Sequence, residues 1–123
     1  MSTIETDFDF GKVKIQNDIV IAEMKEGITF DINYNAEFLK FCKDHFKEKT
    51  YGYISNRVHS YSVNPTVYID TAKNSNIRAI AIVTSDPINK GNAEIERQFF
   101  EYPFEVFTTL EQAVKWMNQV LSN

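Results

Sequence analysis

The sequence predicts an α/β domain with one mixed, mostly parallel sheet of about five strands and helices packed on it. Three observations predict this class. Patterns typical of strands and helices alternate along most of the 123 residues, which favours parallel strands joined by helical crossovers. The first two strand patterns instead follow each other directly and predict an N-terminal β-hairpin. The most apolar run, residues 77–85, is typical of a central strand covered on both faces.

The predicted hairpin opens the fold. Val13 and Ile15 alternate with polar residues, which indicates a strand with one buried face. Asn17 and Asp18 follow, and both residue types tolerate the positive φ angles of a two-residue turn. The chain is therefore expected to run from a candidate disordered segment, residues 1–7, into strands over residues 9–16 and 19–25.

The first helix is predicted between residues 31 and 49. Apolar residues recur there at spacings of three and four, and polar residues take the other face. Asp31 or Asn33 can cap the N-terminus of this helix. The apolar stripe consists of Tyr34, Phe38, Phe41, Cys42, His45 and Phe46. A short aromatic strand, residues 50–55, follows.

The next loop, within residues 54–68, is rich in serine, asparagine and tyrosine. Its Asn64–Pro65 pair is a helix-start signal, because Asn caps well and Pro at the first helical position loses no needed N–H group. A short helix over residues 65–73 is therefore predicted, with a strand over residues 66–69 as the alternative. The apolar strand of residues 77–85 comes next.

A third helix and a last strand are predicted before the C-terminal segment. Ile95, Phe99 and Tyr102 recur at helical spacing with charged residues opposite them, and Pro103 ends this helix. The segment 104–109 then predicts a strand.

The C-terminal segment predicts an amphipathic helix. It begins with a capping box, formed either by Thr108 with Glu111 or by Thr109 with Gln112. The apolar stripe of this helix consists of Leu110, Ala113, Val114, Met117, Val120 and Leu121.

Composition and charge describe a single folded domain over residues 1–123. Hydrophobic residues make up 43% of the chain, enough for a core without disulfides or metal staples. The net charge of −4, without a basic cluster, argues against nucleic acid as a partner. No run approaches the roughly 20 apolar residues that span a bilayer, and no signal-peptide pattern begins the chain. A cytoplasmic protein without a transmembrane segment is expected, and no cofactor is predicted because no phosphate-binding glycine loop occurs.

The element order and the C-terminal segment "YPFEVFTTLEQAVKWMNQ" resemble the SpoIIAA-like group, which is related to STAS domains and to the CRAL-TRIO lipid-transfer fold. In that group a late strand reads apolar-x-Val-Phe, and a short polar cap leads into a helix with Ala and Trp one turn apart. The corresponding positions here are Val106, Phe107, Thr109, Ala113 and Trp116. The similarity of element order covers nearly the whole chain, and the motif covers about the last twenty residues.

The resemblance implies a SpoIIAA/STAS-like sheet and two different functions. STAS domains of the anti-sigma-antagonist type bind a protein partner and are switched by phosphorylation of an Asp-Ser-(Ser/Thr)-Gly stretch at a helix start. The CRAL-TRIO relatives bind an apolar small molecule between sheet and helices. Here "VNPT", residues 63–66, occupies the place of the switch, and Asn64 stands where the family has its serine. The phosphorylation switch is therefore predicted to be missing at that position, with Ser62 and Thr66 as nearby hydroxyls.

Candidate binding residues lie mainly in two loops. Ligands of open α/β sheets bind beyond the carboxyl ends of the strands, where the loops 55–64 and 84–91 are expected. Phe99–Phe100 is a separate candidate, because adjacent helical residues cannot both face one core. The candidate ligand-binding or partner-binding residues are Arg57, His59, Tyr61, Ser62, Asn64, Ser85, Lys90, Phe99 and Phe100.

No catalytic or metal-binding residue is predicted. A hydrolase triad would need a loop serine in contact with His59 and an acid such as Asp31 or Asp70, but the sequence has no Gly-x-Ser-x-Gly elbow. Cys42 and His45 share a helix face, yet two ligands are too few for a metal site.

Two functional hypotheses lead, and a small hydrolase or other enzyme is the third. The first is a non-enzymatic regulatory or protein-interaction domain that binds a protein partner or a second copy of itself as a homodimer. The alternative is a carrier of a small apolar molecule, such as a lipid, of CRAL-TRIO type. A core filled by side chains favours the interaction domain, and a continuous apolar cavity favours the carrier.

Overall fold

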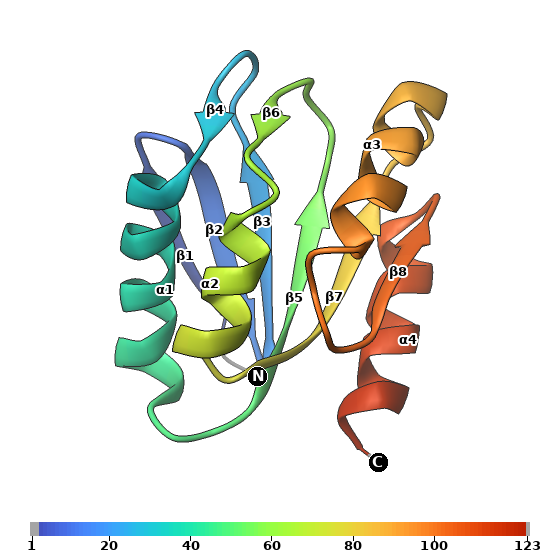
Figure 1. The fold of residues 1–123 in the computed structure, drawn as a ribbon. Helices are drawn as coiled ribbons and strands as arrows, with labels where there is room; N and C mark the ends of the chain where they lie inside the picture. Colours follow the sequence, from blue (N-terminus) through green and yellow to red (C-terminus); the bar gives the residue numbers. More distant parts are fainter. Residues whose placement is uncertain (1–2, 123) are drawn as a thin grey trace.

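The computed structural model describes residues 3–122, which form one mixed sheet with helices on both faces (Figure 1). The strands of this sheet are β1 (Thr3–Phe8), β2 (Gly11–Gln16), β3 (Ile19–Met24), β5 (Tyr51–Asn56), β7 (Ile77–Val83) and β8 (Phe104–Phe107). They pair in the order β1-β2-β3-β5-β7-β8. The first two pairs are antiparallel and the other three are parallel. The predicted α/β class is confirmed, with six strands in the sheet instead of about five.

The hairpin of β2 and β3 has the predicted alternation and turn. Val13 and Ile15 are buried whereas Lys12 and Lys14 are exposed, and Asn17 has a φ of 56° in the turn. The structure differs from expectation in the candidate disordered segment. Residues 1–2 of that segment lie outside the described residues, but β1 pairs along all of β2. Because β1 buries little of its surface, its sequence gives only a weak strand signal.

Three helices cover one face of the sheet and the fourth covers the other (Figure 1). Helices α1 (Ile32–Phe46), α2 (Val67–Asn74) and α3 (Pro87–Arg97) connect the parallel strands, and α4 (Leu110–Leu121) ends the fold. The predicted caps are present at two of them. The Asp31 carboxylate accepts a hydrogen bond from the Ile32 N–H at 2.8 Å, and the Thr109 hydroxyl accepts one from the Gln112 N–H at 3.2 Å.

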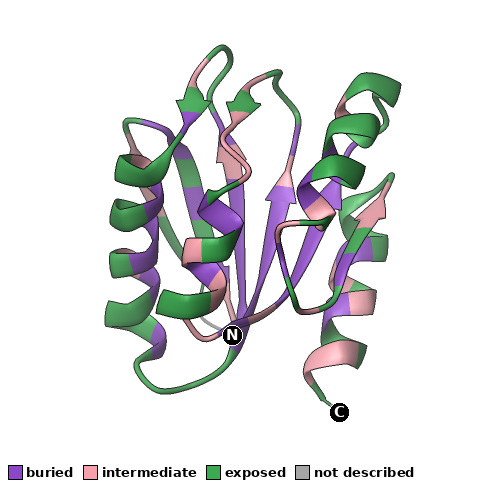
Figure 2. Cartoon of the chain, in the orientation of Figure 1, coloured by how far each residue is buried: buried purple, intermediate pink, exposed green. Residues whose placement is uncertain are grey.

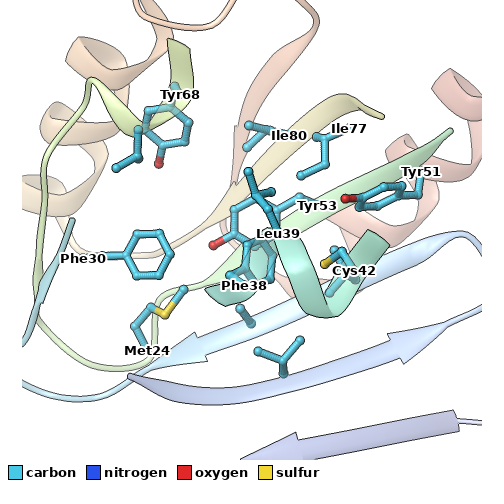
Figure 3. Close-up of a cluster of buried hydrophobic side chains, with 14 of the residues drawn as sticks. Met24, Phe30, Phe38, Leu39, Cys42, Tyr51, Tyr53, Tyr68, Ile77 and Ile80 are labelled. Atoms are coloured by element: carbon cyan, nitrogen blue, oxygen red, sulfur yellow. The ribbon is translucent and has the colours of Figure 1, made fainter. Parts of the chain in front are cut away.

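Two apolar cores lie on the two faces of the sheet. The larger core joins the sheet to α1–α3, and Figure 3 shows part of it, with side chains from both layers in contact. In this core the rings of Phe46 and Tyr51 stack with centroids 4.1 Å apart. The smaller core packs Ala113 and Met117 of α4 against β5 and β7. These two central strands are therefore buried along most of their length, and the outward helix faces are exposed (Figure 2).

The loop within residues 54–68 is ordered by a second, short sheet. Strand β4 (Thr29–Phe30) pairs in parallel with β6 (Ser62–Val63) beyond the ends of β3 and β5 (Figure 1). Helix α2 follows, so the short helix predicted after Asn64–Pro65 is confirmed and the strand alternative was wrong. The side-chain oxygen of Asn64 accepts a hydrogen bond from the Thr66 N–H at 3.2 Å, one turn before the helix proper.

Candidate functional site

The loops that follow β5 and β7 meet at one edge of the sheet and line an open groove of about 410 Å³. We call it the strand-end groove; it is lined by residues 56–60, 83–86, Asn89, Thr108 and Leu110. It lies beyond the carboxyl ends of the parallel strands, where open α/β sheets bind ligands. Among the predicted residues, Arg57, His59 and Ser85 border this groove. Lys90 was expected in the loop 84–91, but α3 begins at Pro87, and Lys90 is exposed on this helix and is not among the lining residues.

The surface of the strand-end groove combines apolar and polar groups. Val58 is 58% exposed, and Leu110 also presents apolar surface to solvent. Helices α3 and α4 both begin at this edge, but their caps use nearby side chains. The Asp86 carboxylate accepts a hydrogen bond from the Ile88 N–H at 2.9 Å, and Thr109 caps α4. Some of the free N–H groups at the N-termini of α3 and α4 therefore already donate hydrogen bonds to side chains of this chain.

The guanidinium group of Arg57 is committed to an internal ion pair. It is buried, with 8% of the residue exposed, and it faces Glu96 of α3, which is 5% exposed. Its two terminal nitrogens donate to the two carboxylate oxygens of Glu96 at 2.9 and 2.5 Å. Burial alone would lower the pKa of Arg57, but Tyr61 and Glu96 outweigh it and hold the pKa well above its ordinary value. This candidate binding residue is therefore already paired with a carboxylate of its own chain.

Three hydroxyl groups complete this buried network. The Tyr68 hydroxyl donates to Glu96 at 2.5 Å, and the Ser55 hydroxyl accepts from the Arg57 Nε–H at 3.2 Å. The Tyr61 hydroxyl lies 2.9 Å from the Ser55 oxygen, and the Arg57 guanidinium lies 5.4 Å from the Tyr61 ring centre. Burial raises the pKa of both Tyr61 and Tyr68, so both phenols stay protonated at neutral pH. The network joins β5, α2 and α3.

Glu96 was not among the predicted residues, because the spacing of Ile95, Phe99 and Tyr102 indicated the wrong helix face. That spacing also predicted a helix up to Pro103, whereas α3 spans Pro87–Arg97. The predicted stripe placed Ile95 inside, but Ile95 is 56% exposed, and Ala93 and Glu96 are the buried residues of this helix. The competing stripe of Ala93, Glu96 and Phe100 has the same helical spacing. The sequence alone does not favour this stripe, because an acidic residue is rarely buried unless it is paired, and its partner Arg57 lies 39 positions away.

The remaining candidate residues do not join one site. His59 is exposed, and its Nδ1 lies 3.9 Å from a Glu26 carboxylate oxygen. Ser62 lies in β6, and the Asn64 amide donates to Asp31 at 2.9 Å. Phe99 and Phe100 follow the end of α3 at Arg97, so they are not the adjacent helical residues that were predicted; Phe100 is buried in the larger core and Phe99 is half-buried against it. Tyr61 belongs to the Arg57 network.

The described residues do not assemble the catalytic or metal arrangements considered from the sequence. Ser55 contacts Tyr61 and Arg57, and the nearest acid to His59 is Glu26. Asp70 bonds to the side chains of Asn35 and Asn74. Within residues 3–122, no group of three or more His, Cys, Asp and Glu side chains is placed to hold a metal ion.

The space between the sheet and helices α1 and α2 is filled by side chains (Figure 3). An internal space of about 10 Å³ remains there, lined in part by Phe30, Asn35, Tyr53, Tyr61 and Tyr68. This volume admits about one water molecule. Pockets that hold small organic ligands are typically about 300 to 1,000 Å³.

Comparisons with known proteins agree with this architecture. A family model described as "Domain of unknown function (DUF7793)" matches residues 13–121. No curated protein matches the sequence. A crystal structure of an uncharacterized protein of the DUF3478 family from Shewanella loihica PV-4, described as having a SpoIIAA-like fold, superposes with a TM-score of 0.56. The two chains are 9% identical, and the match covers 94% of this chain and 92% of the other. The chain therefore has a SpoIIAA-like fold. None of the helices within residues 3–122 is both long enough and apolar enough to cross a bilayer.

Proposed function

This chain belongs to the DUF7793 family, a domain of unknown function, and we propose from its geometry that it is a non-catalytic protein-interaction domain. Its binding surface is the strand-end groove. The partner is another protein or a second copy of the chain, held by contacts outside the core. This is the type of role that STAS domains of the anti-sigma-antagonist type fulfil.

The observation that carries the proposal is the closed core. About 10 Å³ of internal space remains beside the Arg57 network, which is far too little for a lipid or another apolar ligand. The buried arginine that would attract an anionic ligand is neutralised by Glu96. A ligand of the carrier type would have to displace packed side chains and break this pair, which weighs against a CRAL-TRIO type of function.

The strand-end groove has the character of a small protein interface. Val58 and Leu110 supply exposed apolar surface, and polar groups of Ser60, Ser85 and Asp86 surround it. Interfaces commonly combine an apolar centre with a polar rim. The groove is open and built from loops that rigid strands hold in place, so a partner can reach it without any rearrangement of the core.

The proposed binding does not depend on phosphorylation at the position where STAS domains carry their switch. Asn64 occupies that position, and its side chain bonds to both Asp31 and Thr66. Asn cannot accept a phosphoryl group as serine does, and this Asn has a structural role in the turn before α2. Partner binding is therefore expected not to be regulated by phosphorylation of residue 64.

Site-specific photocrosslinking in cells tests the proposal. A benzophenone amino acid replaces Val58 in the groove or, as a matched control, Ile69, an apolar residue of α2 that is 42% exposed. The proposal predicts a discrete protein adduct from position 58 and none from position 69. A Val58 protein that forms no adduct, or an adduct that forms equally from Ile69, would overturn the assignment of the groove.

A further inference from the structure

Helices α1 and α2 both end at the opposite end of the sheet (Figure 1). A second hollow, of about 320 Å³, is lined by residues from these two helix ends. Lys43 and Lys47 reach it from the end of α1, and Lys73 reaches it from the last turn of α2. The nearly buried Tyr51 and the half-buried Ser75 line it between the helices. We call this feature the lysine hollow. It shares no lining residue with the strand-end groove.

Three exposed lysines line this hollow of an acidic protein. Glu48 is the single acidic residue that lines the hollow, so its lining has an excess of positive charge, whereas the whole chain has a net charge of −4. Within the described residues, the ion pairs of lysine involve Lys40 with Asp44, and none includes Lys43, Lys47 or Lys73. Like charges gathered around one hollow repel each other, and a bound anion relieves that repulsion.

Lysines near helix C-termini can also serve to cap the last carbonyl groups, but other donors do so here. The Phe46 carbonyl accepts from the Lys49 N–H at 3.0 Å, and the Lys47 carbonyl accepts from the Asn76 amide at 3.4 Å. At the end of α2, the Thr71 carbonyl accepts from the Ser75 hydroxyl at 2.6 Å. The lysine ammonium groups are therefore not used as caps, and their donors remain for a group from outside the chain.

We infer that the lysine hollow binds a small soluble anion that carries two or more phosphate groups, such as a diphosphate. Ammonium groups bind phosphate oxygens as flexible point charges, and three of them match an anion with several negative charges. A recessed hollow of about 320 Å³ accommodates a compact ligand of this kind. A long nucleic acid would instead require a continuous basic surface, and three lysines around one hollow do not form one.

Nuclear magnetic resonance titration of the 15N-labelled protein with inorganic pyrophosphate tests the inference, with sodium chloride at equal ionic strength as reference. Saturating shifts are expected for amides of residues 43–48 and 73–76, and none for residues 56–60 in the groove. The triple variant Lys43→Gln, Lys47→Gln, Lys73→Gln is expected to weaken binding about tenfold or more. The control Lys25→Gln, Lys90→Gln, Lys115→Gln loses the same charge at exposed positions, and its affinity is expected to change by less than about twofold.

Two results would overturn the inference. One is a linear, non-saturating response equal to that of chloride, and the other is an equal loss of affinity in both triple variants. Phosphatidylcholine vesicles containing phosphatidic acid distinguish a soluble ligand from a lipid headgroup. If the protein binds these vesicles but not pyrophosphate, the lysines face a membrane surface and the soluble ligand is wrong. Because the lysine hollow and the strand-end groove share no lining residue, and the groove amides serve only as an unshifted reference, this outcome is independent of the proposed partner binding.

Discussion

Arg57 belongs to the loop that borders the strand-end groove, yet its guanidinium group points inward to α3. The ion pair neutralises the buried charges of Arg57 and Glu96, and Tyr68 donates a third hydrogen bond to the Glu96 carboxylate. A complete buried pair contributes little net stability, because desolvation offsets most of the attraction. Loss of one partner is costly, because the other charge stays buried and unpaired.

Replacement of Glu96 by Gln is therefore expected to destabilise the protein strongly. The change leaves the Arg57 charge buried without a counter-charge, and the expected loss is about 3 to 5 kcal/mol in the free energy of unfolding. Urea unfolding measures it. Glu94→Gln is the matched control, since Glu94 forms an exposed pair with Arg97 on the same helix and is expected to cost less than about 1 kcal/mol. Equal effects of the two substitutions would contradict the burial of the ion pair between Arg57 and Glu96.

Cys42 is the one cysteine of the chain, and its thiol is fully buried in the larger core. Burial raises its pKa from the ordinary 9.0 to about 12, because the thiolate would lack solvation. The folded state thus favours the protonated thiol, so this contribution to stability is present below about pH 9 and is lost as pH rises toward 12.

A thiol reagent such as dithionitrobenzoate is expected to label Cys42 very slowly in the native protein at pH 8 and rapidly in urea. Labelling of the native protein at the rate of the unfolded chain would contradict the buried position of this side chain.

At the scale of elements, the local signals of the sequence were sufficient for most helices and strands. Asp31 and the Thr109–Gln112 pair mark the starts of α1 and α4, because caps act within a few residues. Asn64–Pro65 correctly predicts a helix, but α2 begins at Val67 with Thr66 at the N-cap position, so Asn64 is not its cap. The pairing of β4 with β6 could not be read in the same way. These strands have two residues each, and their order comes from contact between loops that lie more than 30 positions apart.

The contact of α4 with the sheet depends on a small residue. Gly52 of β5 lies directly beneath Met117 of α4, and an added methyl group at Gly52 would overlap the Met117 side chain. Met117 is fully buried and cannot move aside without disturbing the smaller core. The position explains why this aromatic strand contains a glycine.

Gly52→Ala is expected to lower the free energy of unfolding by about 1 to 3 kcal/mol, the usual cost of overpacking a core. Chemical denaturation measures this change. Gly91→Ala serves as the control, because Gly91 lies in α3 with nothing near an added methyl group, and there the substitution is expected to stabilise by about 0.5 to 1 kcal/mol. A neutral or stabilising Gly52→Ala substitution would contradict the close packing of α4 on β5.

At the scale of the whole molecule, the order of alternating elements was enough to predict the α/β class. Sequential parallel strands usually lie next to each other, and the observed order β3-β5-β7-β8 follows this rule. The edge strand β1 and the inward direction of Arg57 were not accessible, because both depend on partners far away in the sequence or on a weak burial pattern. Two of the candidate binding residues, His59 and Ser85, border one groove, and their role in binding stays a prediction.

The closed core and the external groove support the proposal that this domain acts by surface contact and does not carry a ligand inside. Native mass spectrometry of the purified protein tests this claim most directly. The expected result is the bare chain mass of 14.3 kDa, or an integral multiple of it if the partner is a second copy. A co-purified adduct with the mass of a lipid would contradict the closed core, and would show that α1, α2 and the sheet separate to enclose an apolar molecule.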